Sequence, residues 1–229
     1  MGDLLYVPVI HAAPDMGSLA RGLEGKAVTL LGGETWARHR ATVAGLWQSI
    51  ARFFDSVNAS GLVVFQDGLV AGGDAGQRVV REGAAAGSPN FLVIQGLVAR
   101  GAVIAATEAA APVRQEMDYL RNISDSRTPG EREAAALRYR RALVRLTRER
   151  DAYIAGRVAG ELSHGGRGVL FIGAYHDVIS RLPPGISVRE VKKLAMVRGY
   201  LNLLVQPGRQ PGLFRELAEY LTAPVQVAG

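Results

Sequence analysis

The stretch ERDAYIAGRVAGELSHGGRGVLFIGAYHD, from Glu149 to Asp177, determines the fold that we expect for this chain. Its first part continues a helical pattern, a Gly-rich turn follows, and the apolar run GVLFIGAY is typical of a buried strand. This strand leads directly to Gly173, His176 and Asp177 at its carboxyl end. Because ligands of open α/β sheets bind just outside the carboxyl ends of the strands, the stretch predicts a site as well as a strand.

Further apolar runs have the length of strands and alternate with helical patterns. The strand candidates are residues 3–10, 27–31, 61–66 and 101–108. We therefore expect an α/β fold with a mostly parallel central sheet flanked by helices. At 229 residues the chain is long enough for a single α/β domain over residues 1–229, with residues 109–150 as a helical excursion from the sheet.

Capping patterns mark where the later helices begin. The sequence TPGE at residues 128–131 has the pattern of a capping box with proline in the first turn. It predicts a long helix that ends near Ser163 and precedes the last core strand. The sequence SVRE at residues 187–190 repeats the capping-box spacing, which predicts another helix through about Val205.

The composition excludes several classes of protein. The chain has no cysteine, which rules out disulfides, thiolate metal sites and a cysteine nucleophile. It also has no apolar run near the roughly 18 to 20 residues of a membrane span, so we expect no membrane partner. The N-terminus lacks the pattern of a signal peptide, and a cytoplasmic location is the simplest expectation.

The net charge of +6 raises the question of nucleic-acid binding. Many of the arginines, however, fall along the predicted long helix, at positions 132, 138, 140, 141, 145, 148, 150 and 157. A solvated basic helix face explains this spacing without a partner. With no zinc-finger, KH or RNP pattern in the chain, nucleic acid is an unlikely partner, whereas association of the chain with copies of itself stays open.

Ionisable residues stand where the predicted strands end. They are His11, Glu34, Asp67, Glu108 and His176 with Asp177. Parallel strands would bring these side chains to one edge of the sheet. Two histidines with carboxylates suit a divalent metal such as Mn, Co or Zn, with His11, His176 and Glu34 as ligands. The same set could work without metal, with a histidine as general base beside a carboxylate. Further candidates for substrate binding are Asp15, Asp67, Asp177 and Arg38.

Arg150 lies inside the apolar face of the predicted long helix. At 100° per residue that face contains Leu143, Leu146, Tyr153, Ile154 and Val158. A buried guanidinium needs a partner, because its burial alone is costly. Arg150 could hold a structural carboxylate, or it could bind an anionic substrate or transition state. Glu149 lies at the edge of the same face.

The sequence ERDAYIA, followed by a strand that ends in Gly-x-x-His at Gly173 to His176, resembles the second half of the TraB pheromone-shutdown family. The wider superfamily includes the TIKI metalloproteases, the ChaN-like proteins and the erythromycin esterases. Its members carry a histidine motif at the first strand and Gly-x-x-His near the C-terminus. Here the first motif is PVIH, ending at His11, with proline where the family usually has glycine. Glu34 with Arg38 is similar to the Glu and Arg that follow the family's second strand.

The resemblance implies an α/β hydrolase with a site made of His11, His176, Arg150, Glu149 and Glu34. Metal dependence is associated with the TIKI branch and haem binding with the ChaN-like branch. Our leading hypothesis is a hydrolase of ester or amide bonds that acts on a small-molecule or peptide substrate, with or without a divalent metal. The alternative is a non-catalytic protein of the same fold that binds a small, haem-like ligand.

Overall fold

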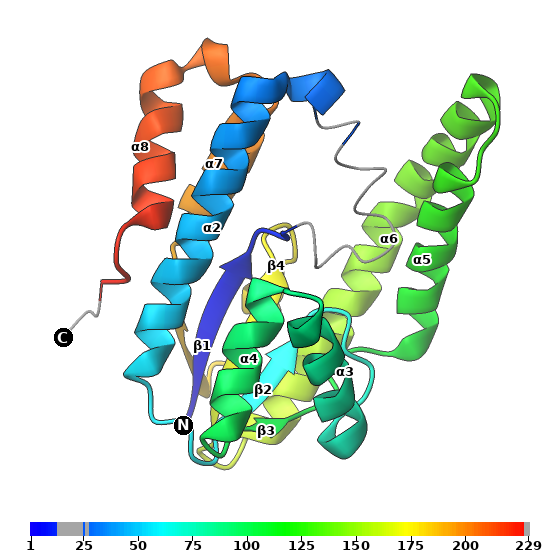
Figure 1. Ribbon diagram of the computed structural model, residues 1–229. Coiled ribbons are helices and arrows are strands. Elements are labelled where there is room, and N and C mark those ends of the chain that lie inside the picture. Colours follow the sequence, from blue (N-terminus) through cyan, green and yellow to red (C-terminus); the bar gives the residue numbers. More distant parts are fainter. Residues whose placement is uncertain (13–24, 26–27, 227–229) are drawn as a thin grey trace.

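The computed structural model describes residues 1–12, 25 and 28–226, and a five-stranded parallel sheet runs through it (Figure 1). Its strands are β1 (Gly2–Val9), β2 (Val63–Gln66), β3 (Val103–Ile104), β4 (Arg167–Gly173) and β5 (Ile186–Glu190). They lie in the order β3-β2-β4-β1-β5, and every pairing is parallel. The expected α/β fold with a parallel sheet flanked by helices is confirmed.

Helices cover both faces of the sheet. On one face, α6 (Pro129–Leu162) packs through Ile154, Val158 and Leu162 against strand residues such as Leu170. The other face packs against α2 (Gly33–Asp55), α3 (Gly73–Ala85), α4 (Pro89–Ala99), α7 (Leu194–Leu204) and α8 (Pro211–Thr222). Strand β4 lies between β1 and β2, and its residues 168–172 are all buried, as expected for a parallel strand covered on both faces.

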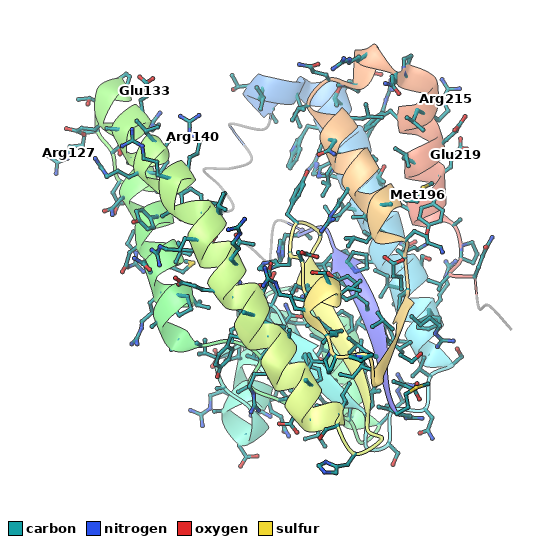
Figure 2. All side chains as sticks on the ribbon, turned by 180° about the vertical axis from the view of Figure 1, so that it is seen from behind. Arg127, Glu133, Arg140, Met196, Arg215 and Glu219 are labelled. Atoms are coloured by element: carbon teal, nitrogen blue, oxygen red, sulfur yellow. The ribbon has the colours of Figure 1, made fainter. Side chains whose placement is uncertain are left out.

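The long helix before β4 is confirmed, together with its capping box. The Thr128 hydroxyl accepts a hydrogen bond from the Glu131 backbone N–H, and the Glu131 carboxylate accepts one from the Thr128 N–H, each at 3.2 Å. The first half of α6 pairs with α5 (Ala110–Ser124) as a helical hairpin that extends beyond the sheet. Figure 2 shows Arg127, Glu133 and Arg140 at the outer end of this hairpin. Tyr153, expected on the buried face of α6, is 42% exposed.

Two predicted elements are wrong. Residues 28–31 were expected in a strand and are helical, and Leu30 is 75% exposed. A short run of β-branched and leucine residues fits either state, so its pattern alone does not decide between them. Residues 186–190 form the edge strand β5 rather than the start of a helix. In place of a capping box, the Glu190 carboxylate accepts a hydrogen bond at 2.8 Å from the Leu194 N–H, in the first turn of α7.

Two short 3-10 helices complete the described elements, at Ile179–Arg181 and Pro207–Arg209. Among the helices of the described part of the chain, none is both long enough and apolar enough to cross a membrane.

Candidate functional site

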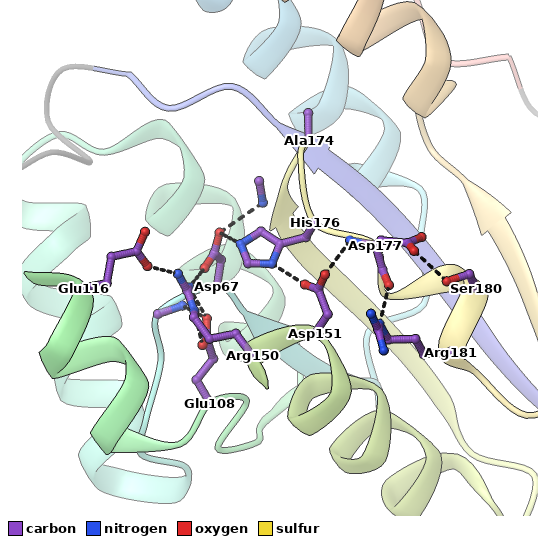
Figure 3. Close-up of polar contacts among 12 residues, drawn as sticks. Asp67, Glu108, Glu116, Arg150, Asp151, Ala174, His176, Asp177, Ser180 and Arg181 are labelled. Carbon is purple, nitrogen blue, oxygen red and sulfur yellow. Dashed lines mark hydrogen bonds and ion pairs between the residues drawn. The ribbon is translucent and has the colours of Figure 1, made fainter. Parts of the chain in front are cut away.

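The carboxyl ends of the strands bring together side chains from distant parts of the sequence (Figure 3). The contacts meet around Gly173, the last residue of β4. A Cβ atom added there would lie 3.2 Å from Asp67 Oδ2, 3.5 Å from His176 Cδ2 and 3.9 Å from His11 Nε2. His11 follows β1, Asp67 follows β2 and His176 follows β4, so the predicted convergence of these strand-end residues is confirmed.

His176 is held by a carboxylate from α6. Its Nδ1 lies 2.5 Å from Asp151 Oδ1, and the other carboxylate oxygen of Asp151 accepts the Asp177 backbone N–H at 2.9 Å. Asp151 is 2% exposed and His176 is 9% exposed. A carboxylate that accepts a hydrogen bond from Nδ1–H fixes the orientation and the tautomer of the ring. It also directs Nε2 away from the carboxylate.

The Nε2 atom of His176 faces a second carboxylate. It lies 3.7 Å from Asp67 Oδ2, which is too long for a direct hydrogen bond. Burial lowers the pKa of His176, but the hydrogen bond to Asp151 and the charge of Asp67 outweigh burial and raise this pKa above its usual value of 6.5. The two carboxylates therefore favour the imidazolium form of His176.

Arg150 binds a group of carboxylates beside this histidine. Its Nε donates to Glu108 Oε2 and its Nη2 donates to Asp67 Oδ1, both at 2.6 Å. Nη2 also donates to the other oxygen of Glu108, and Nη1 donates to Glu116 of α5. Of the two roles open to Arg150 from the sequence, this geometry favours the holding of structural carboxylates. Four of its five N–H groups are used, so at most one is left for a substrate.

These contacts shift the pKa values of the carboxyl groups in opposite directions. Burial raises the pKa of Asp67, but His176 and Arg150 lower it more strongly, to about 2. Burial raises the pKa of Glu108, and the charge of Asp67 adds to this in spite of the hydrogen bond from Arg150. Opposite pKa shifts in neighbouring carboxyl groups are typical of functional sites, although ion-pair networks also produce them.

The cluster lies at the inner end of a cavity of about 980 Å³. His11, Asp67, Arg150, Asp151 and His176 line it on the side of the sheet. The hairpin of α5 and α6 lines it opposite, with apolar side chains at positions 113, 117, 120, 143 and 144. The loop after β4 contributes Tyr175, Asp177 and Arg181. A volume of this size accommodates a small-molecule ligand.

Several predicted site residues lie elsewhere. Glu34 is in the first turn of α2, where it forms an exposed ion pair with Arg38, and neither residue lines the cavity. Glu34 follows a helical segment rather than a strand, which is why it does not reach the sheet edge with the histidines. Glu149 points away from the cavity and pairs with Arg145, with about half of each side chain exposed. Asp15 lies outside the described residues.

The sequence analysis missed residues that complete the cluster. Asp151 is three residues before Ile154 and so shares its buried face. The helical spacing that placed Arg150 on this face could also have placed Asp151 there. Glu116 carried no such signal, because it lies on a different helix, 34 residues from the arginine that it binds. Arg198 of α7 donates to the carbonyl oxygens of Ala174 and His176, at 2.6 and 2.9 Å, and so holds the turn that carries the histidine.

Arg150 competes with a divalent metal for the carboxylates of this cluster. It binds both oxygens of Glu108 and one oxygen of Asp67, and its positive charge opposes a second cation beside them. Within the described residues, no group of three or more histidines and carboxylates is placed to hold a metal ion. The metal site predicted from His11, His176 and Glu34 stays a prediction, to be tested by metal analysis.

For a catalytic role of this cluster we expect Gly173→Ala to lower turnover about tenfold, because the new methyl group displaces Asp67 Oδ2 by a few tenths of an ångström. The control is Gly160→Ala on α6, where a Cβ meets nothing within 4 Å and should stabilise the helix slightly. Turnover and urea unfolding of both variants test this expectation. Full activity in Gly173→Ala would show that the spacing around Gly173 is not critical.

Comparisons of this chain with models of known protein families, with curated proteins and with solved structures find no match. The resemblance to the TraB superfamily therefore stays a prediction that rests on the motifs around His11, Arg150 and His176.

Proposed function

We propose that this chain hydrolyses ester or amide bonds, with His176 as the acid/base group. The observation that carries the proposal is the 2.5 Å contact between Asp151 Oδ1 and His176 Nδ1 inside a cavity of ligand size. An aspartate that orients a histidine, with the second ring nitrogen turned toward a cavity, is an arrangement used for proton transfer in hydrolases.

In the proposed reaction a water molecule at His176 Nε2 is the nucleophile. The water oxygen forms a bond to the carbonyl carbon of the substrate while His176 accepts one water proton. Collapse of the tetrahedral intermediate breaks the bond from carbon to the leaving oxygen or nitrogen, and the imidazolium returns the proton to the leaving group. The products are a carboxylic acid and an alcohol or amine. Asp151 stabilises the imidazolium, and His11, which lines the same cavity, is the proposed donor to the developing oxyanion.

Asp67 and Arg150 have a supporting role in this proposal. Asp67 lies 3.7 Å from the same Nε2 and accepts the Gly173 N–H at 3.0 Å, so it positions the water and the strand end together. His176 and Arg150 together keep Asp67 ionised in a buried place, because both lower the pKa of that carboxyl. Arg150 is thus a positioning residue in this proposal, which corresponds to the first of the two roles that the sequence left open.

The first test is turnover of a panel of esters and amides by the wild type and by His176→Ala. We expect the variant to lose at least about 10²-fold in kcat while remaining folded, since removal of a general base has at least this effect. The His11→Ala variant should lose activity as well. Elemental analysis of the purified protein, and turnover after incubation with EDTA, test the predicted Mn, Co or Zn. We expect turnover to persist without metal, and full activity in His176→Ala would refute the proposal.

A second cavity favours the alternative function, the binding of a small ligand. It measures about 660 Å³, lies between α2 and α4, and has aromatic walls that include Trp36, Trp47 and Phe54. His11 and His39 also line it, and burial lowers the pKa of His39 to about 4, so this ring is neutral at pH 7. A planar aromatic ligand such as haem suits these walls. A Soret band on addition of haem, without turnover of any ester or amide, would favour this function.

A further inference from the structure

The cavity at the strand ends has a group of apolar side chains on the side of the α5–α6 hairpin. The sheet side presents His11, Asp67 and His176, whereas the hairpin side presents valine, leucine and methionine side chains next to Glu116, Tyr139, Thr147 and Arg148. The α5 residues of this wall, Val113, Met117 and Leu120, are spaced at i, i+4 and i+7 and so lie on one helix face. From α6, Leu143 and Val144 join them. We call these five residues the hairpin wall.

The hairpin wall exposes apolar surface that no other part of the described chain covers fully. Val144 is 61% exposed and Met117 is 42% exposed, although both line the cavity. Apolar surface in contact with water is unfavourable, and a ligand that covers it gains binding free energy in proportion to the area covered. A wall of this kind opposite a catalytic cluster is a specificity surface for an apolar substituent.

The wall is attached to the catalytic cluster through Glu116, the residue before Met117. One Glu116 oxygen accepts from Arg150, and the other accepts the Tyr139 hydroxyl at 2.7 Å. The same carboxylate thus joins α5, α6 and the guanidinium that holds Asp67. This connection holds the wall at a fixed position relative to His176. An acyl chain that lies on the wall would therefore place its carbonyl group next to the cluster.

From these observations we infer that the substrate of the proposed hydrolase carries a long apolar acyl chain, which lies along the hairpin wall while its ester or amide carbonyl lies at His176. The inference rests on the proposed function. It assigns the hairpin wall to an acyl chain of the substrate. The test below would also reveal a second copy of this protein on the wall.

The experiment compares kcat/KM for p-nitrophenyl acetate, butyrate and octanoate. Each methylene that the wall covers should raise kcat/KM about fourfold, so we expect octanoate to exceed acetate at least tenfold. The double variant Met117→Gln/Val144→Asn should lower the octanoate-to-acetate ratio at least tenfold, because the new side chains keep their bulk but are polar. The matched control is Val205→Asn, since Val205 is 59% exposed and does not line the cavity.

The second cavity supplies a further control. Gly96 lines it from α4, and a Cβ at this position meets nothing within 4 Å, so the larger side chain in Gly96→Leu should extend into that cavity and narrow it. The octanoate-to-acetate ratio should not change in Gly96→Leu. If the ratio falls in this variant but not in Met117→Gln/Val144→Asn, the chain occupies the other cavity and the inference is wrong.

Binding of decanoate, measured by calorimetry, separates failure of the inference from failure of the proposed function. Decanoate that binds the wild type but not Met117→Gln/Val144→Asn, with no ester or amide hydrolysed, would support the apolar ligand and refute the hydrolase. Turnover of all three esters at equal kcat/KM, with no decanoate bound, would refute the inference and keep the hydrolase. A wild-type dimer that Val144→Asn dissociates would assign the hairpin wall to a second copy and would also overturn the inference.

Discussion

Asp151→Asn should lower kcat by about 10²- to 10⁴-fold while the chain stays folded. The Asp177 backbone N–H donates to one carboxylate oxygen of Asp151, and an asparagine would keep its carbonyl oxygen there. Its amide NH₂ would then face His176 Nδ1, which must become an acceptor. The ring proton would move to Nε2, the nitrogen that has to accept a proton from water. The substitution thus stabilises the wrong tautomer with little change in shape.

The pH dependence of the same variant gives a second readout. In the wild type the pKa of His176 lies above 6.5, so kcat/KM should rise with pH through that raised pKa as the neutral base forms. The hydrogen bond to Asp151 is a main cause of the raised pKa. In Asp151→Asn, kcat/KM should therefore rise at lower pH than in the wild type. A profile of kcat/KM between pH 5 and 10 measures both effects. Asp118→Asn, at an exposed aspartate paired with Arg121, is the control. If kcat/KM rises at the same pH in Asp151→Asn as in the wild type, a group other than His176 controls the pH dependence.

Arg150→Met should destabilise the protein by about 3 to 5 kcal/mol, because it leaves buried carboxylates without their cation. The side chains concerned are Asp67, Glu108 and Glu116, which are 10%, 0% and 17% exposed. The control on the same helix is Arg145→Met, whose ion pair with Glu149 is about half exposed and should contribute at most about 1 kcal/mol. Urea unfolding at pH 7 measures both variants. A loss below 1 kcal/mol of unfolding free energy in Arg150→Met would contradict this expectation. It would show that water, or protonation of the carboxyl groups, replaces the stabilisation that Arg150 provides.

The pH dependence of stability should differ between the wild type and Arg150→Met. In the wild type the pKa of Asp67 is about 2, below its unfolded value of 3.8, so the stability it contributes is present above pH 3.8 and is lost as the pH falls toward 2. Burial already raises the pKa of Glu108 in the wild type, and without the hydrogen bond from Arg150 this pKa should rise further, while His176 still lowers the pKa of Asp67. The variant should then gain stability as the pH falls from 7 toward 4. Adding Glu108→Gln to Arg150→Met should recover part of the loss at pH 7.

The sequence predicted the parallel sheet because its buried strands are continuous apolar runs with helical patterns between them. Strand β5 was missed because SVRE at residues 187–190 fits the spacing of a capping box, while Ile186 and Val188 alternate as an edge strand does. Residues 28–31 were placed in a strand because a short apolar run without flanking context is ambiguous. Neither error concerned β1, β2 or β4, which carry the site.

The site could be predicted as far as the positions of strand ends allow. His11, Asp67 and His176 each follow a strand, and parallel strands end at one edge, so their proximity follows from topology alone. The contact of Arg150 with Glu116 could not be read from the sequence, because it depends on how far α5 extends over the sheet edge. Glu149 was expected at the site through the family resemblance, and Glu34 also from its place after a predicted strand. The structure pairs each with an exposed arginine four residues away on its own helix.

Helix α6 is one continuous helix, and its two halves have different neighbours. Its C-terminal half packs on the sheet and supplies Arg150 and Asp151, whereas its N-terminal half pairs with α5 in the hairpin. Seven residues are close to two helical turns, so removing or adding seven in each hairpin helix preserves the inward face. Related chains could therefore lengthen or shorten the hairpin in paired steps and accept different substrates without rebuilding the chemistry. The same property makes residues 117–144 a natural segment to exchange when the substrate range of this protein is engineered.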